Sequence, residues 1–168
     1  MTLNELNGFD HAQFVAALAD VFEHSPWVAA RAFAARPFAD VAALHAAMVA
    51  AMQAADDSEK LALIRAHPEL AGRAMVRAEL TPDSSREQAD AGLTQCSPDE
   101  FARLSALNAR YSWKFGFPFI LAVKGRTRAG IIAEFARRVE RDRATEFAAC
   151  LAEIARIARI RLEAMIPS

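Results

Sequence analysis

The residues best suited to chemistry lie in one short segment, residues 65–72 (RAHPELAG). Proline disfavours helical backbone for the residue before it, so His67 is expected to leave the preceding helix. Proline also suits the first position of a helix, which predicts a new helix from Pro68 to about Ala78. Free N–H groups at a helix start would favour the neutral imidazole of His67. Two interpretations stay open: His67 serves as an acid or base, or it caps a structural corner.

A second polar cluster comprises Ser84, Ser85, Arg86, Glu87 and Gln88. Either Ser84 with Glu87 or Ser85 with Gln88 fits a capping box, so a short helix is expected here, after a loop over residues 80–83. The same turn offers hydroxyl groups, an amide, free N–H groups and a carboxylate, which could cradle a polar heterocycle. Helix capping and ligand binding by these residues do not exclude each other.

The final helix, expected over residues 144–165, carries an arginine on its apolar stripe. With Phe147 as the zero of angle and about 100° per residue, five apolar residues fall within about 60° of it: Leu151, Ile154, Ala158, Leu162 and Met165. Arg161 falls at about −40°, inside that stripe. A buried arginine needs a partner. It either reaches solvent or a structural carboxylate, or it offers its planar fork to a carboxylate or ureido ligand.

Residues 114–123 (KFGFPFILAV) form the one stretch without helical spacing. Gly116 and Pro118 oppose a helix, and the apolar residues are contiguous, so a short extended buried segment is expected near 115–123. The sequence contains no second strand to pair with it. Its backbone N–H and C=O groups therefore need other partners, which are expected to be helix ends or a ligand.

The rest of the chain predicts an all-α fold, a single compact domain over residues 1–168 with about eight to ten helices. Helix-start signals recur along the chain. They are Thr2 with Glu5, Asp10, Ser25 with Pro26, Asp40, Ser97 with Pro98 and Glu100, and Thr127. The helix after Ser97 is expected to run through Tyr111, and Gly92 should end the helix before it.

Composition excludes several classes of function. The 168 residues carry a net charge of −1, which gives no field for nucleic acid or an anionic membrane surface. No apolar run approaches the roughly 20 residues of a membrane span, and no secretory signal opens the chain. Cys96 and Cys150 are expected to be reduced thiols. No metal-ligand, GxGxxG, Walker or GxSxG motif occurs. A cytoplasmic protein without a bound metal is expected.

Taken together, these segments resemble one family, the 2-oxo-4-hydroxy-4-carboxy-5-ureidoimidazoline (OHCU) decarboxylases of urate breakdown. The resemblance runs from about Phe9 to Met165, and the combination of the His-Pro corner with Phe-Gly-Phe-Pro-Phe-Ile is specific. Glu69 departs from the aspartate common in the family. The segments that carry the resemblance are residues 21–27 (VFEHSPW), 63–72 (LIRAHPELAG), Ser84 with Glu87 and Gln88, 91–93 (AGL), Leu107 and Asn108 with Tyr111, and 114–120 (KFGFPFI).

The resemblance implies a cofactor-independent carboxy-lyase that converts OHCU to (S)-allantoin. It implies His67 as the acid or base and Glu87 as the residue that orients or charges its ring. It also implies a homodimer. The implied substrate contacts are Pro68, Ser84, Ser85, Arg86, Gln88, Phe119, Ile120, Leu121, Ala122, Val123 and Arg161. The alternative is a non-catalytic helical module that binds a ureide or a partner helix.

Overall fold

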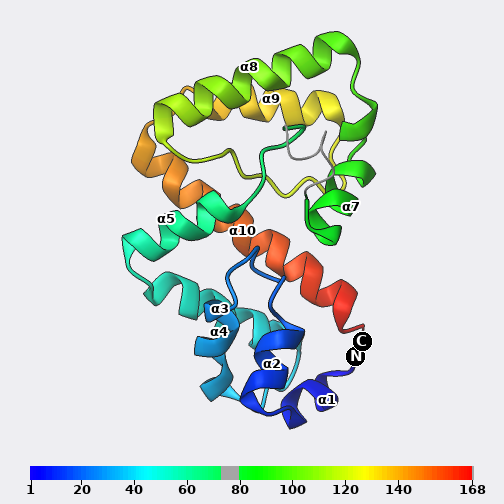
Figure 1. The fold of residues 1–168 in the computed structure, drawn as a ribbon, viewed down its shortest axis with the longest axis vertical. Coiled ribbons are helices and arrows are strands. Elements are labelled where there is room, and N and C mark those ends of the chain that lie inside the picture. Colours follow the sequence, from blue (N-terminus) through cyan, green and yellow to red (C-terminus); the bar gives the residue numbers. More distant parts are fainter. Residues whose placement is uncertain (73–79, 168) are drawn as a thin grey trace. The chain divides into compact units, whose positions relative to one another are not determined.

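The computed structural model describes residues 1–72 and 80–167. Within these ranges the regular structure is helical throughout, with nine α-helices, two 3-10 helices and no strand (Figure 1). The all-α prediction is therefore confirmed. The chain divides into two compact units, Met1–Ala66 with Ile154–Ser168, and His67–Glu153. A single domain spanning the whole chain stays a prediction.

The first unit is built from short helices with local caps. The Thr2 and Asp10 side chains accept the N–H groups of Glu5 and Gln13, and Asp40 accepts that of Ala43, as predicted. The predicted Ser25 cap is wrong, because its hydroxyl donates to the Glu23 carbonyl instead. The helices are α1 (Leu3–Gly8), α2 (His11–Ala17), α3 (Trp27–Ala32), η1 (Phe33–Ala35), α4 (Val41–Ala54) and α5 (Asp57–Ala66).

The core of this unit follows the predicted apolar stripe of α4. Leu44, Met48 and Met52 lie four residues apart and are fully buried, so they point to one side of the helix. Phe14 from α2 is buried as well, and α3 packs against both α2 and α4. The last part of α10 completes the unit with Leu162, which is also fully buried.

The second unit contains the longer helices. The Ser97 capping box, the Thr127 cap and the left-handed Gly92 after α7 are all as predicted. Helix α8 lies beside α9, and α10 begins in this unit and continues into the first. The elements are α7 (Pro82–Asp90), η2 (Leu93–Gln95), α8 (Pro98–Phe115), α9 (Arg128–Arg138) and α10 (Arg143–Met165).

Two predicted boundaries in this unit are wrong. The helix placed at Ser84 or Ser85 begins at Pro82, because Thr81 accepts the Ser84 N–H and proline fills the first helical position without losing a hydrogen bond. Of the predicted loop, Leu80 and Thr81 lie outside the helix as expected, whereas Pro82 and Asp83 belong to it. Helix α8 continues to Phe115, so the non-helical segment starts at Gly116, whose φ of 76° ends the helix in the left-handed region.

Aromatic rings fill the core of the second unit. The Tyr111 ring meets Phe115, Phe119 and Phe135 edge-on, with centroids 4.5, 5.4 and 5.7 Å away. The Phe119 and Phe135 rings stack 3.9 Å apart. The non-helical segment is thereby packed between α8 and α9, and its side chains form part of the core.

Both cysteines are free thiols, as expected, with Cys150 fully buried. Burial raises the pKa of the Cys150 thiol, which keeps it protonated at neutral pH. In the part of the chain that the structure describes, no helix is long and apolar enough to cross a membrane.

Candidate functional site

The His67-Pro68 corner is a turn and not a helix start. Helix α5 ends at Ala66, as the proline predicts, but residues 69–72 form a turn in which the Gly72 N–H donates to the Glu69 carbonyl. The predicted helix from Pro68 is therefore wrong over residues 68–72, and its remainder lies outside the described residues. The helix N-terminus expected to favour a neutral imidazole of His67 therefore does not begin at Pro68. His67 itself is buried, with 6% of its surface exposed.

The geometry of this turn explains two of its residues. Ala71 adopts a positive φ of 50°, which is uncommon for a residue with a side chain. A Cβ at Gly72 would lie 2.7 Å from the Glu69 Cβ, closer than two carbon atoms can approach, so glycine is required there. Such a conformation needs support from the surrounding structure.

Two buried amide side chains give that support. The Ala71 N–H donates to Oε1 of Gln88 at 2.9 Å, and Nε2 of Gln88 donates to the Glu69 carbonyl at 3.3 Å. From α8, Nδ2 of Asn108 donates to the Leu70 carbonyl at 2.8 Å. Helices α7 and α8 thus hold three successive backbone positions directly after the His67-Pro68 corner.

The predicted polar cluster divides between two faces of α7. Ser84 and Gln88 are one helical turn apart and buried, whereas the side chains of Ser85 and Arg86 are exposed. Arg86 lies 3.5 Å from Asp83 on that outer side. Glu87 is half-buried, beside Gln88. The structure therefore brings Gln88 to the His67 turn, and the substrate contacts of Ser85 and Arg86 stay predictions.

Replacing Asn108 with leucine is expected to lower the free energy of unfolding by about 1–3 kcal/mol. Leucine has a similar size but cannot donate to the buried Leu70 carbonyl, which then lies in the interior with its hydrogen bond lost. Urea denaturation measures the change. Ser105→Leu, at an exposed position of the same helix, is the control and should change stability by less than about 0.5 kcal/mol. Equal stability of N108L and wild type would contradict the proposed support.

The non-helical segment obtains hydrogen bonds from side chains. The Ile120 carbonyl accepts from Arg138 at 2.7 Å, and the Ala122 N–H donates to Glu153 at 2.8 Å. The Ala122 carbonyl accepts from Arg126 at 3.1 Å. For these groups the expected partners, helix ends or a ligand, are wrong, because charged side chains beside or beyond the segment reach its backbone.

Arg161 lies in the first unit and is buried, as its place on the apolar stripe predicts. Its NH1 group donates to Oε2 of Glu23 and to the Asp20 carbonyl, each at 2.8 Å. Both charged side chains are almost fully buried, at 4% and 2% exposed. The structural-carboxylate alternative is therefore what the structure shows, and a substrate contact by Arg161 stays a prediction.

Sequence reasoning missed three residues with evident roles. Glu23 pairs with Arg161, and Arg138 with Glu146 forms a second buried ion pair at 2.9 Å. A signal for Arg138 was present, because it lies three residues after Phe135 and seven after Ile131, on the buried side of α9. Among the described residues, no group of three His, Cys, Asp or Glu side chains could hold a metal ion.

The second unit thus offers a buried imidazole next to a turn that two helices hold, and a backbone segment that charged side chains hold. A water-poor imidazole suits the transfer of one proton. Fixed backbone N–H and C=O groups suit the recognition of an amide-like or ureido edge. These features fit a small polar ligand that exchanges a proton.

Comparison with known proteins gives consistent matches. The model of the family described as OHCU decarboxylase matches residues 7–163. A 2-oxo-4-hydroxy-4-carboxy-5-ureidoimidazoline decarboxylase from Haloferax volcanii is 41% identical over 162 residues, covering 96% of this chain and 94% of that protein. The uric acid degradation bifunctional protein PucL from Bacillus subtilis is 42% identical over 98% of this chain, which spans 33% of PucL. A crystal structure of (S)-allantoin synthase matches with a TM-score of 0.77 at 28% identity, covering 99% of this chain and 54% of that one.

Proposed function

Because the chain belongs to the OHCU decarboxylase family, we propose that it removes the carboxylate of OHCU and delivers (S)-allantoin in urate degradation. The family match over residues 7–163 is the observation that carries this proposal. The buried His67, with its turn fixed from α7 and α8, supports it from the structure.

The reaction mainly requires the protein to position the substrate and the reacting groups. The departing carboxylate is β to a ring C=N, so the electron pair of the breaking C–C bond can move to the imine nitrogen as CO₂ leaves. The enol-like intermediate then takes one proton, and the face on which it arrives sets the handedness of allantoin. A protein must fix the carboxylate out of the ring plane, stabilise charge on nitrogen and oxygen, and control that proton.

In this proposal His67 controls the proton and Glu87 orients or charges its ring. The turn that Gln88 and Asn108 hold supports this role, because it fixes the backbone directly after the imidazole. The planar guanidinium group of Arg161 binds the carboxylate or the ureido group of the substrate while it keeps its contact with Glu23. The remaining contacts are Pro68, residues 84–88 and the backbone of residues 119–123.

The test generates OHCU in place with uricase and hydroxyisourate hydrolase. We expect added protein to accelerate the decay of OHCU absorbance and to give allantoin with the circular dichroism of the S enantiomer, equally with and without EDTA. Decay and handedness that do not respond to the protein would overturn the proposal. Binding of allantoin without any acceleration would instead favour the non-catalytic ureide-binding module. The homodimer and the cytoplasmic location belong to this proposal; the homodimer rests on the family resemblance, and the cytoplasmic location on the expectation from the sequence.

A further inference from the structure

We propose that Arg138 is a positioning residue that, anchored by Glu146, fixes the Ile120 carbonyl and so sets the backbone of residues 119–123 for substrate contact. This inference rests on the proposed function, since it concerns the segment assigned to the substrate there. It assigns a role to a buried ion pair that the proposed chemistry does not use directly.

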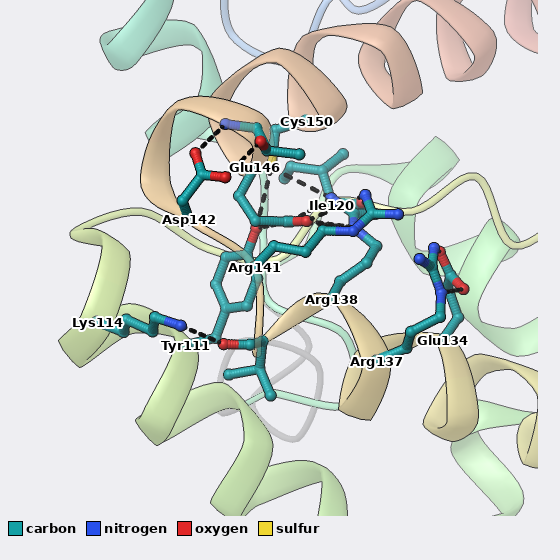
Figure 2. Close-up of polar contacts among 12 residues, drawn as sticks. Tyr111, Lys114, Ile120, Glu134, Arg137, Arg138, Arg141, Asp142, Glu146 and Cys150 are labelled. Carbon is teal, nitrogen blue, oxygen red and sulfur yellow. Dashed lines mark hydrogen bonds and ion pairs between the residues drawn. The ribbon is translucent and has the colours of Figure 1, made fainter.

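Every nitrogen of the Arg138 guanidinium group has a hydrogen-bond or ion-pair partner. Its Nε lies 3.0 and 3.3 Å from the two Glu146 carboxylate oxygens, and NH2 lies 2.9 Å from Oε2. The remaining nitrogen, NH1, donates to the Ile120 carbonyl at 2.7 Å, as Figure 2 shows. The Glu146 carboxylate and the Ile120 carbonyl thus contact two edges of the planar guanidinium group. Because this group is rigid, the carboxylate fixes the direction in which NH1 points.

Glu146 is itself fixed. The Tyr111 hydroxyl from α8 donates to Oε2, and Arg141 lies 3.5 Å from Oε1 (Figure 2). Burial raises the pKa of Tyr111, so its hydroxyl stays a donor at neutral pH. Burial alone would lower the pKa of Arg138, but the hydrogen bond and the charge of Glu146 hold it above its ordinary value. Residues of α8, α9 and α10 therefore meet at one carboxylate next to the segment.

Stability alone does not account for this arrangement. The Arg138 and Glu146 side chains are 2% and 0% exposed, and removing two charges from water costs free energy that their attraction only partly returns. Apolar residues of similar volume would fill the space as well or better. They could not donate a hydrogen bond to a carbonyl. What the ion pair adds over an apolar core is a fixed backbone position at Ile120.

The fixed positions also indicate which groups face the substrate. Protein side chains occupy the Ile120 carbonyl and both backbone groups of Ala122. Residues 118–123 are neither helix nor turn. The N–H and C=O groups of Leu121, which lies between these held residues, are therefore the ones assigned to the substrate in this proposal.

The test compares the double variant R138M/E146L with R137M/E134L. The second pair is the adjacent ion pair, Arg137 with Glu134, at the more exposed side of the same helix. Replacing both members of the buried pair leaves neither of its two charges in the interior, so the first variant is expected to fold, with a melting temperature lowered only by the hydrogen bonds lost at the Ile120 carbonyl and the Tyr111 hydroxyl. Its KM for OHCU should rise about tenfold or more, because the Ile120 carbonyl is released. The kcat should fall less, and R137M/E134L should match wild type.

Hydrogen exchange of the backbone amides in residues 117–123 gives a second measurement. Exchange should speed up in R138M/E146L and stay unchanged in R137M/E134L. Wild-type protein that turns over OHCU, together with an unchanged KM and unchanged exchange in R138M/E146L, would overturn the positioning role alone. Wild-type protein that does not accelerate OHCU loss would overturn the proposed function, and with it the substrate contact inferred here.

Discussion

The variant His67→Gln is expected to lose OHCU turnover by a factor of about 10²–10⁴ while its fold stays intact. Glutamine retains hydrogen-bonding atoms but cannot exchange a proton near neutral pH, so the step that the proposal gives to His67 fails. The corner itself should persist, because Gln88 and Asn108 hold the backbone after it from outside. Initial rates of OHCU loss and thermal melting by circular dichroism measure the two effects.

The matched control is His45→Gln, at a half-buried histidine of α4 whose ring nitrogen lies 2.8 Å from the Ala155 carbonyl. This control removes an imidazole from a structural setting and should keep wild-type turnover. Glu87→Gln should lower turnover as well, since it removes the charge proposed to act on the imidazole of His67. Wild-type rates in H67Q would contradict the proposal, and a collapsed melt of H67Q would return His67 to a corner-capping role.

Local signals explain why most helix starts could be predicted. A cap such as Asp40 or Ser97 needs only its own side chain and an N–H three residues on, so its evidence lies within a few residues. The prediction of where α7 starts was wrong because three possible capping residues lie within five residues of one another. Thr81 prevails, since it alone leaves proline at the first helical position. That register puts Ser84 and Gln88 together on the buried face.

Tertiary partners could not be predicted in the same way. The apolar stripe of the final helix shows that Arg161 is buried, but its partner Glu23 lies 138 residues earlier in the chain. The non-helical segment shows a similar limit. Its sequence indicates that the backbone needs hydrogen-bond partners, whereas the choice of Arg138 and Glu153 depends on how helices α9 and α10 pack. Residue spacing predicts which side of a helix is buried, but it does not predict which residue lies against that side.

The variant Arg161→Met is expected to lower the free energy of unfolding by about 3–5 kcal/mol. Methionine keeps much of the packing volume but removes the guanidinium, which leaves the buried Glu23 carboxylate without its ion-pair contact at 2.8 Å. The double variant R161M/E23L should recover most of that loss, because neither charge of this pair then stays in the interior. Urea denaturation of the two single variants and the double variant measures the coupling, and a double variant as unstable as R161M would contradict it.

The same double variant separates the structural role of Arg161 from its proposed contact with the substrate. A stable R161M/E23L protein without the guanidinium should show a raised KM for OHCU, because an apolar side chain cannot bind a carboxylate or ureido group. R161K, which keeps the charge and loses the fork, should raise KM as well. Wild-type KM in both would confine Arg161 to its pairing with Glu23, and the substrate carboxylate would then need another cation.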